Sequence, residues 1–539
     1  MSQSRARRVL LVEDSDVQSE TLVRRFEEAG YAVTLAATYA EANRELQTGH
    51  FHLAVIDVCL DLSEGATDQG LDLLKDIEIL HLRQVMPAII VTQYSSYDLV
   101  KNLLESGAAF FVEKESGYIA RLLDKTQTLF QEKVGINFDL NLLANSEQQI
   151  ERVAAYVHQA EDEPQVSAES FSPQVFDLIG KMFQPAESVM LDYVAEGLSG
   201  AAVLRVRPTY PHGLTQPIVA KIGRWEKIEK EQQRYLKNVK FFLSGNHATQ
   251  LDACYMRDLG GLVYTLNLPD VSKDLKGLYQ KKSASQIVGT LERLFRVTCA
   301  AWYANRQPAR FANLRDLYLD AFELTDKPNR IPIVVRDLHP EIDWTLERIV
   351  LAPLTGEYPN PLRWLANDRI AWMPVSTCIT HGDLHADNIL INEEGECWLI
   401  DFYRTYPSHI LRDFVILETD LKYRVMGEIA PQDFLELERA LIDLEPGRSF
   451  QPTLMMPNQA RKAGEVIAGL RAQAWSLLDW QSTGKRAEAQ REYLASLLMA
   501  TLNVIRLRHL RTPAMTNRRE LALLSTLLIC DKLEQLGTA

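Results

Sequence analysis

Residues 8–14, which read RVLLVED, decide the fold of the amino-terminal region. A short apolar run that ends in acids is typical of a buried strand in a parallel sheet, because both faces of such a strand are covered. Similar runs follow at residues 31–37, 51–60, 87–96 and 108–115. Helix-periodic segments accompany them at residues 17–30, 39–49, 70–83, 97–107 and 118–133. This alternation predicts an α/β domain over residues 1–133, with a doubly wound, five-stranded parallel sheet.

The composition indicates a globular protein of several domains. Of 539 residues, 46% are hydrophobic and 24% are charged, and 58 basic against 72 acidic residues give a net charge of −14. This negative balance argues against non-specific binding to nucleic acid, which requires a basic surface. Six cysteines without a CxxC pair favour a reduced compartment. No apolar stretch approaches the ~20 residues of a membrane span. We therefore expect a cytoplasmic protein that binds neither nucleic acid nor a membrane.

Three further regions follow the first domain. Residues 134–173 predict a connector, with one or two helices over 136–159 and then a polar, acidic linker. Residues 187–266 contain several apolar runs around one helical segment, which predicts strands with a single helix. Residues 268–539 are mostly helix-periodic, and a loop–strand–turn–strand pattern interrupts them at 378–402.

Polar side chains fall at the carboxyl ends of the strands predicted in the first domain. They are Glu13, Asp14, Asp57, Thr92 and Lys114. Because the carboxyl ends of parallel strands meet at one edge of a sheet, we expect these side chains to lie close together. Clustered carboxylates repel one another unless they bind a hard cation such as Mg²⁺, which also makes a carboxylate usable as a nucleophile toward phosphorus. A hydroxyl and an ammonium opposite them would bind phosphoryl oxygens.

These five positions resemble, in order, the response-regulator receiver domain, and the resemblance covers roughly residues 5–130. It implies that Asp57 accepts a phosphoryl group from a cognate histidine kinase, and that Glu13 and Asp14 hold Mg²⁺ together with Asp57. The switch residues that it implies are Thr92, Phe111 and Lys114. Glu115 stands where the family usually has a proline. Two other interpretations stay open, namely ordinary solvated acids at strand ends and a receiver fold that is not phosphorylated.

A second motif is the segment 381–388, which reads HGDLHADN. Asp383 and Asn388 lie five residues apart, and Asp401 follows the next predicted hairpin. Phosphoryl transfer from ATP needs a carboxylate that accepts the proton of an attacking hydroxyl, and oxygen ligands for Mg²⁺. Asp383 suits the first task, and Asn388 and Asp401 suit the second.

This motif resembles the aminoglycoside phosphotransferase and choline-kinase-like branch of the protein-kinase fold, and the resemblance covers roughly residues 186–420. The finer resemblance is to the bacterial kinase-like domains of the ternary-complex-associated type. It implies a two-lobed α+β protein-kinase-like fold, with an N-lobe over residues 174–267 and a large helical C-lobe over residues 268–539. It also implies ATP and Mg²⁺ as cofactors, with Asp383 as the catalytic base.

Upstream residues fit the nucleotide site of that fold. The turn at 196–200, which reads EGLSG, would cover phosphates, although such a turn most often marks an ordinary hairpin. Lys221 would neutralise the α- and β-phosphates, and the following helix offers Glu229 or Glu231 as its ion-pair partner. We favour Glu231, because apolar residues follow it at helical spacing. The nucleotide-binding residues that we predict are Gly197, Ser199, Gly200, Lys221 and Glu231.

Other features leave alternatives open. His385 either braces the loop or binds a metal, and bracing is favoured because most histidines are structural. Asp413 either caps the helix that it begins or braces the 381–388 loop. The apolar stripe at 494–505 indicates core packing first and a homodimer second. A polar break at 512–517 is expected to separate the last helices.

The two motifs together predict a phosphorelay signalling protein. The receiver would accept phosphate on Asp57 and regulate an ATP- and Mg²⁺-dependent phosphotransferase-like domain that acts on a hydroxyl of an unknown small molecule or protein. The alternative is a phosphorylation-switched scaffold whose kinase-like domain is inactive or only senses nucleotide.

Overall fold

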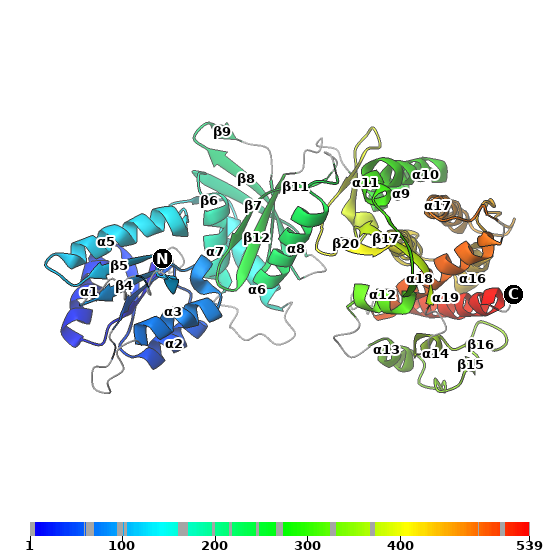
Figure 1. Cartoon of the computed structure of the whole chain (residues 1–539). Helices are drawn as coiled ribbons and strands as arrows, with labels where there is room; N and C mark the ends of the chain where they lie inside the picture. Colours follow the sequence, from blue (N-terminus) through cyan, green and yellow to red (C-terminus); the bar gives the residue numbers. More distant parts are fainter. Residues whose placement is uncertain are drawn as a thin grey trace. The chain divides into compact units, whose positions relative to one another are not determined.

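The computed structural model describes residues 6–58, 60, 69–93, 101, 105–159, 171–196, 200–214, 218–243, 247–265, 273–323, 330–366, 372–482, 484–506 and 513–537. The chain forms two compact units (Figure 1). The first unit contains Met1–Gln232 with Thr249–Leu266, and the second contains Gln233–Ala248 with Asn267–Ala539. Each unit is described by itself.

The first unit begins with a five-stranded parallel sheet in the order β2-β1-β3-β4-β5. Its strands are β1 (Arg7–Val12), β2 (Tyr31–Ala36), β3 (Leu53–Asp57), β4 (Ala88–Thr92) and β5 (Phe110–Glu113). Its helices are α1 (Asp16–Glu28), α2 (Tyr39–Thr48), α3 (Gln69–Ile79) and α5 (Tyr118–Leu129), with short turns η2 (Leu82–Gln84) and η3 (Phe130–Val134). The predicted helix at 97–107 falls mostly outside the described residues. The doubly wound sheet is confirmed.

Alternate residues of β1 enter two different cores, which explains why the strand is apolar throughout. Leu10 packs with residues of α2 and α3 on one face of the sheet. Leu11 packs with residues of α1 and α5 on the other face (Figure 1). A strand covered on both faces needs an uninterrupted apolar run, as in residues 9–12.

A second sheet in the same unit has the order β11-β12-β10-β8-β7-β6, and β9 pairs with β8. Its strands are β6 (Asn141–Leu143), β7 (Ser188–Glu196), β8 (Ala202–Tyr210), β9 (Gly213–Leu214), β10 (Ile218–Arg224), β11 (Thr249–Tyr255) and β12 (Leu259–Thr265). The helices around it are α6 (Ser146–Gln159), α7 (Phe171–Met182) and α8 (Trp225–Asn238). Apolar side chains of α6 and α7 form one core with the sheet. The strands and the single helix predicted within 187–266 are confirmed.

The predicted connector is wrong in two places. Residues 141–143 were expected in a helix but form β6, which pairs in parallel with β7. The pairing is non-local, since Asn141 N–H donates to Glu187 O, and tertiary contacts override the helical preference of the segment. Helix α7 begins at Phe171, inside the expected linker, of which residues 160–170 lie outside the described part.

The second unit is mostly helical. Its helices are α9 (Leu275–Lys281), α10 (Ala284–Arg293), α11 (Ala300–Ala304), α12 (Leu314–Ala321), α13 (Arg330–Leu338), α14 (Pro361–Ala366), α15 (Arg412–Asp420), α16 (Pro431–Ile442), α17 (Asn458–Trp475), α18 (Lys485–Arg506) and α19 (Pro513–Gly537). Shorter turns are η5 (Leu294–Thr298), η7 (Ala386–Asn388) and η8 (Leu421–Val425). The predicted hairpin is present as β18 (Ile389–Ile391) and β19 (Cys397–Leu399), and β13 (Lys273–Asp274) pairs with β18.

More strands occur in this unit than predicted. They are β14 (Gln307–Asn313), β15 (Arg348–Ile349), β16 (Tyr358–Pro359), β17 (Trp372–Thr380) and β20 (Tyr406–His409), with β17 central in the sheet β14-β17-β20. The β-branched and aromatic residues of β17 favour a strand. The expected break at 512–517 is wrong for residues 513–517, because Pro513 starts α19 and proline is well tolerated in a first helical turn.

The apolar stripe of α18 is buried, so core packing is confirmed for it. Its members are Leu494, Leu497, Leu498, Leu502 and Ile505. The predicted homodimer therefore has no support from this stripe. None of the helices in the described part of the chain combines the length and the apolar character needed for a bilayer span.

Candidate functional site

The acid cluster predicted in the first domain assembles at the carboxyl edge of the sheet. Glu13 follows β1, Asp57 ends β3 and Lys114 follows β5. The Lys114 ammonium donates to Glu13 Oε2 at 2.8 Å and to Asp57 Oδ2 at 2.6 Å. Carboxylate oxygens of Glu13, Asp14 and Asp57 all lie within 4.8 Å of one another. We call these four residues the acid pocket.

The acid pocket carries more negative than positive charge. Burial raises the pKa of Glu13, and contacts with Lys114 only partly offset this effect. Burial opposes the charge of Lys114, but its hydrogen bonds to Asp57 and Glu13 raise its pKa overall. Three carboxylates face one ammonium, and such a set fits an additional divalent cation held through oxygen.

Neighbouring residues shape the acid pocket. Thr92 ends β4, is 3% exposed, and accepts the backbone N–H of Lys114 through its own backbone oxygen at 2.7 Å. Phe111 is half-buried on β5. Gly70 lies in the first turn of α3, where an added Cβ would lie 2.5 Å from the backbone oxygen of Asp57. A side chain at this position would therefore push α3 away from Asp57.

The predicted ion pair of Lys221 forms in the second sheet. Lys221 Nζ on β10 lies 2.8 Å from Glu231 Oε2 on α8, and the two residues are 4% and 1% exposed. Tyr264 of β12 donates to Glu231 Oε1 at 2.9 Å. Glu229 is exposed, so the structure selects Glu231 of the two candidates. Residues 197–199, including Gly197 and Ser199, lie outside the described part, whereas Gly200 adopts a φ of +78°.

One buried carboxylate, that of Asp413, holds the start of the 381–388 loop in place. Asp413 accepts the backbone N–H of His381 and the backbone N–H of Gly382, each at 2.8 Å. Burial raises the pKa of Asp413, although these contacts act in the opposite direction. Gly382 has a φ of +80°, and a Cβ there would lie 2.1 Å from the backbone oxygen of Arg404. Of the two roles left open for Asp413, the structure shows the bracing one.

Inside the loop, contacts of the amide nitrogen orient the Asn388 side chain. This nitrogen donates to the backbone oxygen of Asp383 at 2.9 Å and lies 3.1 Å from His385 Nε2. His385 therefore braces the loop, as favoured from the sequence. Asp387 forms an ion pair with Arg424, which also contacts His385 Nδ1 at 3.4 Å.

Asp401 lies beside this loop at the end of the β18–β19 hairpin. The backbone N–H of Ile400 donates to the backbone oxygen of Asn388 at 3.2 Å, which joins the two segments. Asp401 has a φ of +65°, a conformation that few residues other than glycine adopt. Phe402 packs against His381 with ring centroids 5.6 Å apart. The second unit thus brings Asp383, Asn388 and Asp401 to one region, and Lys221 with Glu231 belongs to the first unit.

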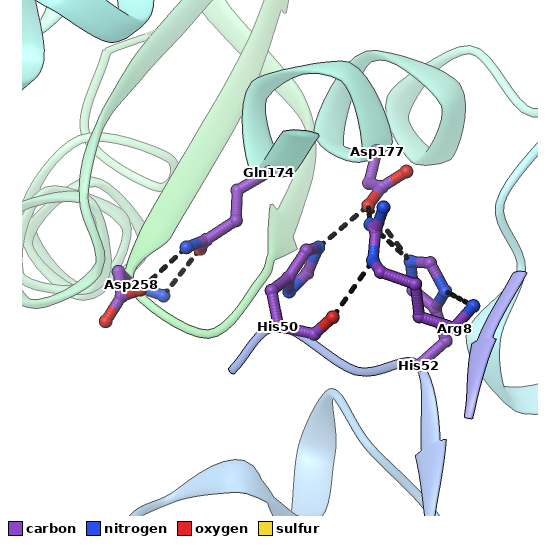
Figure 2. A network of polar contacts seen from close by, with 6 residues as sticks. All are labelled: Arg8, His50, His52, Gln174, Asp177 and Asp258. Atoms are coloured by element: carbon purple, nitrogen blue, oxygen red, sulfur yellow. Dashed lines mark hydrogen bonds and ion pairs between the residues drawn. The ribbon is translucent and has the colours of Figure 1, made fainter. Parts of the chain in front are cut away.

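One polar cluster escaped the sequence analysis. Arg8, His50 and His52 meet Asp177 of α7 at the opposite, amino-terminal edge of the receiver sheet (Figure 2). The pair His50-x-His52 directly before a buried strand was a usable signal, because buried histidines need a partner.

A five-stranded parallel sheet with an acid pocket of this kind defines a receiver-type domain. The family model for the response regulator receiver domain matches residues 9–126, and the chain carries such a domain. The family model for ternary complex associated domain 9 matches residues 335–506, which include the 381–388 loop and Asp401.

Two curated relatives each match this chain over 107 residues. Alginate biosynthesis transcriptional regulatory protein AlgB from Pseudomonas putida is 33% identical over 107 residues, which are 20% of this chain and 22% of that protein. The protein of the same name from Pseudomonas syringae pv. tomato is 32% identical over 107 residues, with the same coverage. The chain therefore spans about a fifth of the length of these relatives.

Among solved structures, a CheY-like receiver domain protein from Methanospirillum hungatei is 27% identical over 24% of this chain and 96% of its own, at a TM-score of 0.22. The receiver domain of a Luxo repressor protein from Vibrio parahaemolyticus is 26% identical over 24% of this chain and 92% of its own, at a TM-score of 0.21. A receiver domain supports a role in phosphorelay signalling and implies a phosphodonor such as a histidine kinase.

Proposed function

We propose that this chain is a phosphorelay protein in which phosphorylation of Asp57 regulates an ATP- and Mg²⁺-dependent phosphotransferase-like domain. The observation that carries the receiver half is the Lys114 ammonium, held between Glu13 and Asp57 in an acid pocket with an excess of carboxylates. The second half has a protein-kinase-like fold and transfers the γ-phosphoryl group of ATP to a hydroxyl of a small molecule or protein.

In the receiver, a carboxylate oxygen of Asp57 attacks the phosphorus of the donor. A phosphorus–oxygen bond to Asp57 forms while the bond from phosphorus to the donor breaks, and the donor leaves with the bonding electron pair. Lys114 stabilises the charge of the phosphoryl oxygens, and Thr92 offers its hydroxyl to them. Glu13, Asp14 and Asp57 would hold Mg²⁺, which would supply charge neutralisation between the carboxylate and the incoming group.

In the proposed phosphotransferase-like domain, one group of residues binds the nucleotide and another residue acts as the catalytic base. Lys221, oriented by Glu231, binds the α- and β-phosphates of ATP. Asp383 accepts the proton of the attacking hydroxyl. The nitrogen end of the Asn388 amide makes the contacts inside the loop, so the oxygen end is the one that a cation would meet, together with Asp401.

The receiver half is tested by incubation with labelled acetyl phosphate and Mg²⁺. Wild type should take up one phosphoryl group, and Asp57→Asn should take up none, because the amide is not a nucleophile. Asp124→Asn is the matched control, since Asp124 is exposed on α5. Equal labelling of wild type and Asp57→Asn would contradict the assignment.

The phosphotransferase half is tested with γ-labelled ATP and Mg²⁺, using small-molecule and protein acceptors. Asp383→Ala should lose turnover, by a factor of about 10² or more, because the general base is missing. The control Asp443→Ala removes a carboxylate that is 69% exposed and should turn over like wild type. Turnover that survives in Asp383→Ala contradicts the catalytic role. If wild type binds ATP without turnover, the scaffold alternative is favoured.

A further inference from the structure

A polar cluster joins the amino-terminal edge of the receiver sheet to helix α7 (Figure 2). His50 Nε2 and His52 Nε2 lie 2.7 Å and 2.9 Å from Asp177 Oδ2, and the Arg8 guanidinium contacts the same oxygen. The Asp177 side chain is 1% exposed. Two segments separated by more than a hundred residues therefore meet at one buried carboxylate. We call these four residues the clasp.

Hydrogen bonds fix the protonation of the clasp. The backbone N–H of Arg8 donates to His52 Nδ1 at 3.0 Å, so Nδ1 carries no proton and Nε2 donates to Asp177. Burial lowers the pKa of His52 to about 4, and it outweighs the hydrogen bond to Asp177, which acts in the opposite direction. Burial alone would raise the pKa of Asp177, but the hydrogen bonds from His50 and His52 lower it below its usual value. Burial also lowers the pKa of His50, so we describe the clasp as one carboxylate, one guanidinium and two neutral imidazoles.

The clasp is not built as a metal site, although ligand atoms of His50, His52 and Asp177 lie within 4.8 Å of one another. The Arg8 guanidinium already contacts the carboxylate oxygen that a cation would need. Binding of a metal to His52 Nε2 would move the ring proton to Nδ1, where it would face the N–H of Arg8. Arg8 supplies the positive charge that balances Asp177. The cluster therefore needs no cation, and it acts as a contact that docks the receiver on α7.

Contacts around the clasp secure the same docking. Arg257, in the β11–β12 turn, donates through its guanidinium to the backbone oxygens of Gln47 and Gly49. Gln174 of α7 donates to Asp258 Oδ2 at 2.6 Å and accepts the Asp258 backbone N–H at 2.9 Å, which ties this turn to α7 (Figure 2). Residues 47–52 of the receiver, which precede β3, are therefore held both by α7 and by the β11–β12 turn.

The strands that enter the clasp are the strands that carry the acid pocket. β1 holds Arg8 near its start and is followed by Glu13, and β3 is preceded by His52 and ends at Asp57. Each strand is five or six residues long, or roughly 17–20 Å at ~3.3 Å per residue. Either strand thus joins the acid pocket at one end to a contact with α7 at the other.

Helix α7 in turn packs closely on the strands beside Lys221. A Cβ added to Gly261 of β12 would lie 1.6 Å from Met182 Cε at the end of α7. Gly261 pairs with Ile222, the residue that follows Lys221 on β10. Glycine at this position lets α7 lie against the strand pair that positions the lysine.

We propose that the amino-terminal edge of the receiver sheet is the surface through which the receiver passes its phosphorylation state to α7, with the clasp as the contact and α7 as its partner in the same chain. This inference rests on the proposed function, since it gives the regulatory connection between Asp57 and Lys221. In this proposal, α7 adopts two positions against the sheet. The acid pocket and the Lys221 region each shift the equilibrium between these two positions.

Hydrogen–deuterium exchange of the full chain, with and without acetyl phosphate and Mg²⁺, tests this inference. Phosphorylated wild type should change the exchange of amides in 171–182 by roughly fivefold or more, which is typical of a coupled pair of sites. Asp177→Asn should still be labelled at Asp57, but its α7 amides should not respond. The control Asp192→Asn, a half-exposed carboxylate on β7, should respond like wild type.

A second variant guards against a folding defect in Asp177→Asn. Arg257→Ala removes the contacts to the 47–49 backbone and an ion pair with Asp258, which keeps its two hydrogen bonds with Gln174. This variant should reduce both the protection of 47–52 and the α7 response. Failure of wild type to be labelled at Asp57 overturns the proposed function and the relay with it. Labelling without a response of α7, or an unchanged response in both variants, overturns the relay alone.

Discussion

The two edges of the receiver sheet differ in how their charges are balanced. At the carboxyl edge, the acid pocket places three carboxylates around one ammonium, Lys114. At the amino edge, the clasp places one guanidinium and two neutral imidazoles around one carboxylate, Asp177. The first set is short of positive charge, and the second is neutral overall.

In our proposal, this difference separates a site for chemistry from a site for docking. An incomplete charge set gains from a divalent cation and can then accept a phosphoryl group. A complete, buried set has nothing to gain from a ligand, but it loses stability when any member is removed. The same two strands, β1 and β3, thus join a reactive end to a structural end.

The largest expected effect comes from opening the clasp. Asp177→Asn leaves the Arg8 guanidinium without its carboxylate, and breaking a buried pair in this way costs about 3–5 kcal/mol. Urea unfolding should show this loss. Asp192→Asn, at a half-exposed ion pair, should cost less than about 1 kcal/mol. Equal losses of unfolding free energy in the two variants would mean that the clasp stabilises the protein no more than a half-exposed ion pair does.

At the other edge, Lys114→Met should slow labelling by acetyl phosphate by roughly 10²–10³-fold, because a positioned donor to the transferred group is lost. Lys75→Met is the matched control, since the Lys75 side chain is 64% exposed on α3. A labelling rate within a factor of about two of wild type would contradict the role of Lys114.

A smaller effect is expected from pH. In the docked receiver His52 has a pKa of about 4, below the ~6.5 of an unfolded histidine, so unfolding takes up a proton between these values. The contribution of the clasp is complete above pH 6.5 and is lost as the pH falls toward 4. At pH 5 the loss is roughly 2 kcal/mol for this group. His50, also of lowered pKa, acts in the same direction, whereas Arg8 and Asp177 keep their charges in this range.

Urea unfolding at pH 7.5 and pH 5 measures this dependence. His52→Gln should show a smaller difference in the free energy of unfolding between the two pH values than wild type. An identical pH dependence in wild type and His52→Gln would show that the histidine does not titrate with docking.

The smallest effect is that of Mg²⁺ on stability. Binding to the acid pocket should stabilise the folded receiver by about 1–3 kcal/mol at Mg²⁺ concentrations from ten to a hundred times the dissociation constant. Chelation should reverse the gain. Replacement of Asp14 by Asn should reduce it, because one oxygen ligand loses its charge. A melting temperature independent of Mg²⁺ would contradict the predicted metal set.

The sequence predicted the reactive edge better than the docking edge, and the reason is the range of the interactions. Glu13, Asp57 and Lys114 follow strands that could be recognised from local patterns, and the topology of a doubly wound sheet then brings them together. The Lys221–Glu231 pair was also predictable, because a strand and the adjacent helix supply both residues. Asp413 was predictable only as one of two alternatives.

The docking edge depends on contacts that local patterns do not contain. His52 and Asp177 are 125 residues apart, and part of α7 was assigned to a linker. β6 was read as helix because its strand character comes from pairing with β7. These elements depend on contacts with segments that are distant in the sequence, and a single sequence does not show which segments make those contacts.

The central claim is that phosphorylation of Asp57 controls the use of ATP by the rest of the chain. The most direct measurement is the rate of γ-phosphoryl turnover by the full chain before and after acetyl phosphate treatment, in wild type and in Asp57→Asn. We predict a change of roughly fivefold or more in wild type and no change in Asp57→Asn. A wild-type rate that is the same before and after labelling, or the same change in Asp57→Asn, would contradict the account.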